Sequence, residues 1–185
     1  MRSPNASNQN SIQAKDKQTG ITLIEALCVV AILVILVQAS SVMLRDFLPK
    51  QKLISRANNL IGLIYLAREQ AAGNAPTLLC AIDSDCNEFT VAAGLELIRD
   101  SNGNFSKDGN EEVLREFRLP EGMTIEWRSF RKKPWLRFDS DARAWYQNGH
   151  YLLCMNNYGL KVIVTRIGRP RVAKGGVSAT LCTTT

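Results

Sequence analysis

A run of basic side chains near the end of the chain could bind phosphate groups. Residues 161–174 contain no acidic residue and five basic ones: Lys161, Arg166, Arg169, Arg171 and Lys174. Such a run suits a polyanion or an anionic membrane surface, and a solvated protein face can have the same composition. Composition alone leaves these alternatives open.

Inside this run, Gly168-Arg169-Pro170-Arg171 has the residue types expected of a phosphate-binding turn. Gly168 permits a tight turn, and Pro170 limits the conformational entropy that the segment loses on binding. In an extended stretch Arg169 and Arg171 point to the same side, and each guanidinium can donate two hydrogen bonds to phosphate oxygens. The alternative is a basic strand edge that discourages pairing with another chain.

A second basic cluster lies earlier in the chain and alternates with aromatic residues. Its basic residues are Arg128, Arg131, Lys132, Lys133 and Arg137, and its aromatic residues are Trp127, Phe130 and Trp135. The cluster could extend a phosphate-binding surface. Packing of a strand in the core explains the aromatic side chains equally well.

Length and composition limit the number of domains and membrane segments that can position these residues. The chain has 185 residues and a net charge of +6, with 45% hydrophobic and 22% charged residues. This length and composition fit one globular domain together with one membrane segment. No nucleophile–base pair, glycine-rich phosphate loop or metal cluster indicates catalysis, so we expect neither an enzyme nor a cofactor.

The membrane segment is predicted at Ile21–Leu44, an apolar stretch whose only charge is Glu25. As a helix it spans about 36 Å, more than the roughly 30 Å core of a bilayer. It is too long for the apolar part of an ordinary signal peptide, and no small-x-small cleavage site follows it. Residues 1–19 before it are polar, and we expect them to be disordered.

Glu25 is the unusual residue of this segment, because a carboxylate in lipid costs a few kcal/mol unless it is paired. A cut after Gly20 gives Ile21 a free α-amino group. The amino terminus of a neighbouring subunit is then a natural partner for Glu25. The alternative is a first-turn acid that interfacial water solvates and the helix dipole favours.

Four of the five cysteines lie in the later part of the chain: Cys80, Cys86, Cys154 and Cys182. An even set outside the cytoplasm indicates two disulfides, and three pairings are possible. We favour Cys80–Cys86 and Cys154–Cys182. A metal site is less favoured, because no CxxC motif is present and His150 is the only histidine. In a cytosolic domain the four would be reduced thiols. Cys28 lies in the apolar segment as a small hydrophobe.

Apolar residues continue at helical spacing after Pro49, which predicts one long helix that is amphipathic in its second half. They are Leu53, Ile54, Ala57, Leu60, Ile61 and Ile64. Pro49 is a predicted kink, and Gly73–Pro76 is a strong stop signal. The apolar stripe needs a sheet to cover it, which favours an α+β fold with one helix on an antiparallel sheet.

Short apolar runs separated by turn residues supply the strands of that sheet. The predicted strands are Thr77–Ile82, Phe89–Ala92, Leu95–Arg99, Val113–Phe117, Met123–Trp127, Trp135–Phe138, Tyr151–Met155, Leu160–Thr165 and Val177–Leu181.

The connection Asp100–Glu112 resembles a calcium loop in the spacing of Asp100, Asn102 and Asn104. Phe105, however, stands where an EF-hand needs glycine, and no helices flank the loop. We therefore interpret it as a polar hairpin loop and expect no metal.

The beginning of the chain resembles a known processing signal. Gly20-Ile21-Thr22-Leu23-Ile24-Glu25 is similar to the class III (prepilin) signal of type IV pilins and type II secretion pseudopilins, although the family usually has phenylalanine where Ile21 stands. The resemblance implies that a prepilin peptidase cuts after Gly20 and methylates the new amino terminus at Ile21. It also implies that Glu25 guides assembly, with the leader in the cytoplasm and the later domain in the periplasm.

The later residues resemble the FimT/GspH group of minor pilins over nearly all of residues 20–172, loosely in the middle. The matching segments are Leu66–Ala71 with Leu78–Cys80, Leu95–Asp100 with Glu112–Arg115, Tyr151–Cys154 and Lys161–Val164. The sharpest match is Gly168–Arg171, which resembles the Gly-Arg-x-Arg motif with which FimT-type pilins bind DNA in natural transformation.

The resemblance implies a leader at 1–20, a transmembrane assembly helix at 21–44, its amphipathic continuation at 45–75 and a periplasmic β-rich domain at 76–185. It implies a minor pilin of the bacterial inner membrane and the assembled pilus. Its partners are then double-stranded DNA, other major and minor pilin subunits, prepilin peptidase and inner-membrane lipid. The rivals are a type II secretion pseudopilin and a pilus-priming or adhesion pilin without DNA binding.

Overall fold

The computed structural model of the chain describes residues 20–89, 91–144, 147–178 and 182, without the side chains of residues 39–45. The chain divides into two compact units, Met1–Val42 and Met43–Thr185, and each is described by itself. The predicted polar leader at residues 1–19 falls outside the described residues.

A single long helix, α1 (Leu23–Ala71), begins the described chain. Thr22 caps it, since the Glu25 main-chain N–H donates to the Thr22 Oγ1 at 3.3 Å. The helix ends where predicted. Gly73 adopts a φ of +70°, and the Asn74 N–H donates to the Ala71 carbonyl at 3.0 Å.

The second half of α1 buries one stripe of small and aliphatic side chains. Its fully buried members are Leu53, Ala57, Leu60, Ile64, Ala67 and Ala71. Their three- and four-residue spacing confirms the predicted amphipathic pattern. Ile54 is the exception, because its side chain is 40% exposed.

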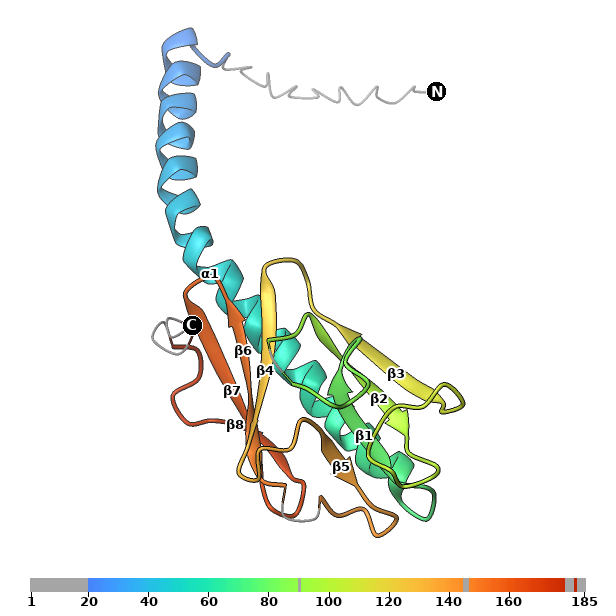
Figure 1. Cartoon of the computed structure of the whole chain (residues 1–185). Helices are drawn as coiled ribbons and strands as arrows, with labels where there is room; N and C mark the ends of the chain where they lie inside the picture. Colours follow the sequence, from blue (N-terminus) through green and yellow to red (C-terminus); the bar gives the residue numbers. More distant parts are fainter. Residues whose placement is uncertain (1–19, 90, 145–146, 179–181, 183–185) are drawn as a thin grey trace, which may run out of the picture. The chain divides into compact units, whose positions relative to one another are not determined.

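In the part of the chain that the structure describes, eight antiparallel strands form two sheets, where the sequence had indicated one (Figure 1). One sheet has the order β3-β2-β1-β5, from β1 (Thr77–Ala81), β2 (Gly94–Arg99), β3 (Val113–Arg118) and β5 (Leu136–Phe138). The other has the order β4-β6-β7-β8, from β4 (Met123–Ser129), β6 (Gly149–Met155), β7 (Tyr158–Val164) and β8 (Pro170–Val172). The turn after β3 leads the chain from one sheet to the other, so these consecutive strands do not pair.

One of the predicted strands is wrong. The described residues of 89–92 form no strand, and Ala92 makes an isolated bridge to Ile125. Of the strand predicted at 177–181, Ser178 makes an isolated bridge to Gly159, and residues 179–181 are outside the described residues, so this strand stays a prediction. Conversely, β8 was not predicted, because three residues that include a proline give no strand signal.

The main core lies between α1 and the two sheets, and it includes Leu60, Leu97 and Tyr151. A smaller cluster packs separately around β1 and β2 and contains Leu78, Cys80, Cys86, Ile98 and Trp135. Each buried aliphatic or aromatic side chain contributes about 1.5–3 kcal/mol to folding. The predicted α+β architecture, with a long amino-terminal helix packed on antiparallel sheet, is confirmed.

Candidate nucleic-acid interface

β7 and β8 form a hairpin whose connection is residues 165–169, and we call residues 158–174 the C-terminal hairpin. The Gly168 N–H donates to the Thr165 carbonyl at 2.8 Å, and the Arg169 N–H donates to the Thr165 Oγ1 at 3.1 Å. β8 is an edge strand, where Pro170 is tolerated although it has no N–H to donate. The segment predicted as a basic loop is therefore a tight turn followed by a strand.

Gly168 is required at this turn for two independent reasons. Its φ is +80°, a conformation that side chains with a Cβ rarely adopt. A Cβ at this position would also lie 3.1 Å from the Ala144 Cβ and closer still to the ring of Phe138. The glycine thus allows both the backbone conformation of the turn and its close packing against Phe138 of β5.

Arg169 and Arg171 are both exposed, whereas Pro170 between them is buried. Residues 168–171 alternate between buried and exposed, as side chains do along an extended stretch, so Arg169, just before β8, and Arg171, within it, share the exposed side. The prediction that they point the same way therefore agrees with the burial pattern of this strand.

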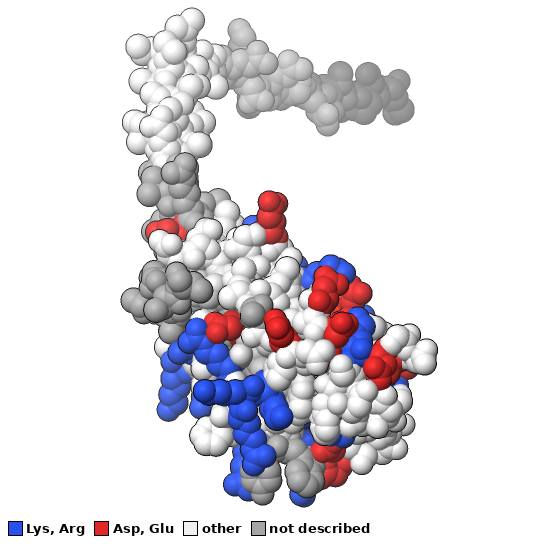
Figure 2. Space-filling view, in the orientation of Figure 1, with Lys and Arg blue, Asp and Glu red and all other residues white. Residues whose placement is uncertain are grey.

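Strand pairing brings other polar residues into line with Arg171. Arg128 is paired with His150, His150 with Ile163, and Ile163 with Arg171, so these four residues form one row across the sheet. Lys161 is half-buried on the same side of β7, two residues from Ile163. Figure 2 shows Lys and Arg side chains gathered over this sheet with few acidic side chains between them. We call the surface that carries Arg128, Lys161 and Arg171 the basic face.

Six basic residues outside the C-terminal hairpin form ion pairs with acidic side chains: Arg99–Glu112, Lys107–Glu96, Arg118–Glu116, Arg128–Glu126, Arg137–Asp139 and Arg143–Asp141. Among the residues that the structure describes, no carboxylate lies within ion-pair distance of Lys161, Arg169, Arg171 or Lys174. Arg166 is exposed at the turn.

The second basic cluster is divided by the fold. Arg128 lies on the basic face, where Glu126 accepts two hydrogen bonds from it at 2.7 and 2.9 Å. Arg137 belongs to the other sheet, where it pairs with Asp139 at 3.0 Å and stacks over the Phe105 ring at 4.4 Å. Arg137 therefore stabilises the domain and does not extend the basic face.

The aromatic residues of that cluster are divided in the same way. Trp127 and Trp135 are buried, so core packing explains them. Phe130 is 80% exposed, just beyond β4, with the exposed Arg131 after it. The Phe130 N–H donates to the Asn148 carbonyl at 2.9 Å, which places Phe130 at the end of the sheet that carries the 165–169 turn.

His150 was not singled out by its sequence, because a lone histidine implies no partner. In the fold it lies between β4 and β7, and its Nε2 is buried without a hydrogen-bond partner among the described residues. Burial lowers the pKa of its imidazole, and the positive charges of Lys161 and Arg128 lower this pKa further, against a smaller opposite effect of Glu126. The surroundings of His150 depend on how β4, β6 and β7 pair, which the sequence alone does not give.

The lowered pKa of His150 makes stability depend on pH. In the unfolded chain the imidazole takes up a proton near pH 6.5, whereas in the folded chain it stays neutral to lower pH. The free energy of unfolding should therefore fall as the pH is lowered from about 6.5 toward the folded-state pKa. Urea unfolding at pH 7.5 and 5.0 measures this loss. His150→Gln should lose less stability over this range, and an equal loss in both proteins would contradict the assignment.

The family model of the type II transport protein GspH matches residues 56–168, which is more than half of the chain. The chain belongs to the GspH family. This makes it a minor type IV pilin or GspH-like pseudopilin, and proteins of these families are structural, non-enzymatic subunits that associate with other pilins. The match ends at Gly168, so it does not bear on Arg169 and Arg171.

Among solved structures, the type IV minor pilin FimU of Pseudomonas aeruginosa (strain PAO1) matches in two crystal forms. Both matches have 16% identity and cover 92% of the FimU chain; one covers 65% of this chain with a TM-score of 0.49, the other 69% with 0.48. No curated protein sequence matches the chain significantly.

The processing residues predicted for this GspH-family chain lie at the exposed start of α1. Gly20, Ile21 and Glu25 are exposed, and the Thr22 cap places Glu25 in the first turn of the helix. Proteins of the GspH and pilin families are membrane-anchored and carry periplasmic domains. Within the described residues, no helix of this chain is both long enough and apolar enough to cross a membrane.

Two disulfides join the four cysteines of the later domain in the pairing favoured from the sequence. Cys80–Cys86 closes a short loop after β1, and Cys154–Cys182 ties the end of the described chain to β6. Cys28 is a free, exposed cysteine of α1.

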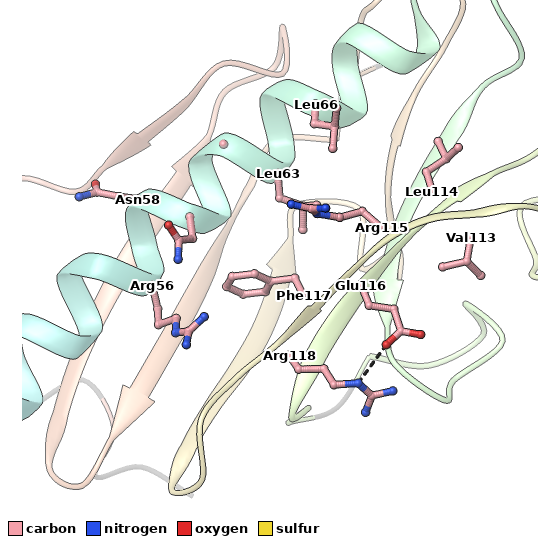
Figure 3. Close-up of a pocket in the computed structure, with 12 residues that line it drawn as sticks. Arg56, Asn58, Leu63, Leu66, Val113, Leu114, Arg115, Glu116, Phe117 and Arg118 are labelled. Carbon is pink, nitrogen blue, oxygen red and sulfur yellow. Dashed lines mark hydrogen bonds and ion pairs between the residues drawn. The ribbon is translucent and has the colours of Figure 1, made fainter.

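A hollow of about 900 Å³ lies away from the basic face, between α1 and the edge strand β3 (Figure 3). Arg115 and Phe117 reach from β3 toward the helix, and Arg118 pairs with Glu116 at 2.9 Å beside it. None of the residues of the C-terminal hairpin lines this hollow.

Proposed function

We propose that this GspH-family chain is a minor type IV pilin that binds extracellular double-stranded DNA for uptake in natural transformation. The observation that carries the proposal is the exposure of Arg169 and Arg171 on one side of β8, without an acidic partner in the described structure. Lys161, Arg166 and Lys174 surround them on the same hairpin.

The geometry of the basic face suits a duplex backbone. Arg128 and Arg171 are three strand spacings apart, which is about 14 Å at about 4.8 Å per spacing. A duplex carries one negative charge per about 1.7 Å of its axis, so such a face meets several phosphates at once. Contacts to phosphate do not read sequence, which suits uptake of DNA of any origin. The exposed Phe130 adds an apolar ring at the same end of the sheet.

The same proposal covers processing and placement. A prepilin peptidase cuts after Gly20 and methylates Ile21, and Glu25 pairs with the new amino terminus of a neighbouring subunit during assembly. Residues 21–44 anchor the chain in the inner membrane until it joins a pilus. Retraction of the pilus that carries this subunit then draws the bound DNA inward.

The dependence of DNA binding on salt tests this proposal. Residues 43–185 contain the whole main core, so they serve as a soluble domain for gel-shift titrations with duplex DNA. Five phosphate contacts predict a slope of about −4.5 for log K against log salt concentration. Retardation that is absent, or that does not change with salt, would show that the hairpin does not bind DNA.

The rival function is a type II secretion pseudopilin or a pilus-priming or adhesion pilin without DNA binding. The family match to GspH is the observation that favours the secretion role. Deletion of the gene separates these roles. Loss of transformation with normal pili supports DNA uptake, loss of all pili supports priming, and loss of protein secretion supports a pseudopilin.

A further inference from the structure

The loop between β2 and β3 (Figure 1) connects two neighbouring strands of one sheet. Its sequence has oxygen-bearing side chains at the spacing of a twelve-residue calcium loop. Counted from Asp100, these side chains stand at positions 1, 3, 5, 9 and 12: Asp100, Asn102, Asn104, Asp108 and Glu111. Position 7 of such a loop, here Ser106, contributes its main-chain carbonyl. The spacing alone did not support a site, because Phe105 occupies the position of the usual glycine.

The conformation of Phe105 removes that objection. Its φ is +67°, the left-handed conformation for which glycine is normally selected at this position. The ring stacks on Trp135 with centroids 5.1 Å apart, and the Arg137 guanidinium lies 4.4 Å from the ring centroid. These contacts stabilise a backbone turn that an EF-hand loop obtains from glycine.

The side chains at the ligand positions already converge. The side-chain amide N–H groups of Asn102 and Asn104 donate hydrogen bonds to the same carboxylate oxygen of Asp108, at 2.6 and 2.7 Å. Glu111, at the last position, accepts hydrogen bonds from the main-chain N–H groups of Ser101 at 2.9 Å and Asp108 at 3.3 Å. The loop thus gathers several oxygen donors around its own backbone.

Asp100 supplies the decisive observation. The residue is fully buried, and its Oδ1 accepts a hydrogen bond from the main-chain N–H of Gly103, within the loop, at 2.8 Å. Its Oδ2 is buried and has no hydrogen-bond partner among the described residues. A buried carboxylate oxygen without a donor or a cation is costly, so this atom indicates a missing positive ligand.

We propose that this loop binds a calcium ion through Asp100, Asn102, Asn104, Asp108, Glu111 and the Ser106 carbonyl. All these ligands are oxygens, as a hard divalent cation requires, and their number and flexibility favour calcium over magnesium. In the described residues, no three His, Cys, Asp or Glu side chains are placed to hold a metal as they stand. Binding therefore draws the carboxylates of Asp108 and Glu111 toward Asp100.

The ion has a structural consequence for the smaller core cluster. The Ser106 Oγ and the Lys107 N–H both donate to the Asp85 carbonyl, at 3.0 and 3.2 Å, which ties the calcium loop to the Cys80–Cys86 disulfide loop. Phe105 in turn covers Trp135. Calcium fixes this loop over the cluster and stabilises the domain, independently of DNA binding at the basic face.

The test uses the full chain in mild detergent after removal of metals with a chelator. Calcium should raise the Tm by about 5–10 °C when its concentration is about 100-fold above Kd. Terbium should bind with luminescence sensitised by Trp135, and calcium should displace it at lower concentrations than magnesium. A Tm that does not respond to millimolar calcium, together with absent terbium luminescence, overturns the proposal.

Variants separate a bound ion from screening of surface charge. Asp108→Asn should weaken calcium binding at least tenfold, and Asp100→Asn should do the same if it folds. Glu112→Gln is the matched control, because this neighbouring carboxylate is exposed, pairs with Arg99 and stands outside the ligand positions. Equal effects of calcium on Glu112→Gln and Asp108→Asn would overturn the proposal. The proposed DNA binding at the basic face does not depend on calcium, so neither result of this test bears on it.

Discussion

Replacing Arg169 and Arg171 together with glutamine should weaken binding of duplex DNA by about 100-fold, if each arginine contributes about 1.4 kcal/mol through charge-assisted hydrogen bonds. Two fewer phosphate contacts should also change the salt slope by about 1.8. Both side chains are exposed, so the free energy of unfolding should change by no more than about 0.5 kcal/mol, which thermal unfolding measures. Gel shifts over a salt series measure the affinity and the slope.

A matched pair controls for the loss of two positive charges. Arg115 and Arg118 are exposed on β3, in the other sheet, and their replacement by glutamine removes the same charge. This second double variant should keep most of the affinity and the original salt slope. If both pairs weaken binding equally, net charge rather than the hairpin attracts DNA, and the basic face is not the binding site.

Gly168→Ala should destabilise the domain by about 2–5 kcal/mol, as the sum of a positive φ and overpacking. The methyl group would collide with the Phe138 ring, and the backbone would hold alanine at a φ of +80°. Urea unfolding of the 43–185 domain measures the change in the free energy of unfolding. The displaced turn should also weaken DNA binding, because Gly168 precedes both arginines.

Gly122→Ala separates the two causes. Gly122 has a φ of +75°, close to that of Gly168, but no atom lies within 4 Å of the position of its Cβ. This variant should lose only the conformational part, about 1–2 kcal/mol. The difference between the two variants is then the cost of the contact with Phe138. Equal costs would show that the turn does not pack against β5 as described.

Much of this protein could be predicted from local sequence patterns. The helical spacing from Leu53 onward, the stop at Gly73 and most strands follow from side-chain periodicity and turn residues. The turn at Gly168 and the alternation of Arg169 with Arg171 are equally local. These features depend on residues within one or two turns or strands, so a single sequence contains them.

Other features depend on which distant segments meet. The division into two sheets, the row from Arg128 to Arg171 and the position of His150 come from strand pairing and register. The sequence could not separate Arg128, on the basic face, from Arg137, which pairs with Asp139 in the other sheet. It also could not show that Trp135 stabilises the left-handed conformation of Phe105.

The sequence by itself determined the long helix, most of the strands, the cysteine set and the residue types that can bind phosphate. Only the tertiary structure decided which basic side chains share a surface, which are neutralised by acids and which polar atoms are buried without partners. The physical reason is the range of the interactions. Periodicity and capping act between near neighbours, whereas register, burial and electrostatic fields depend on contacts between residues far apart in the chain.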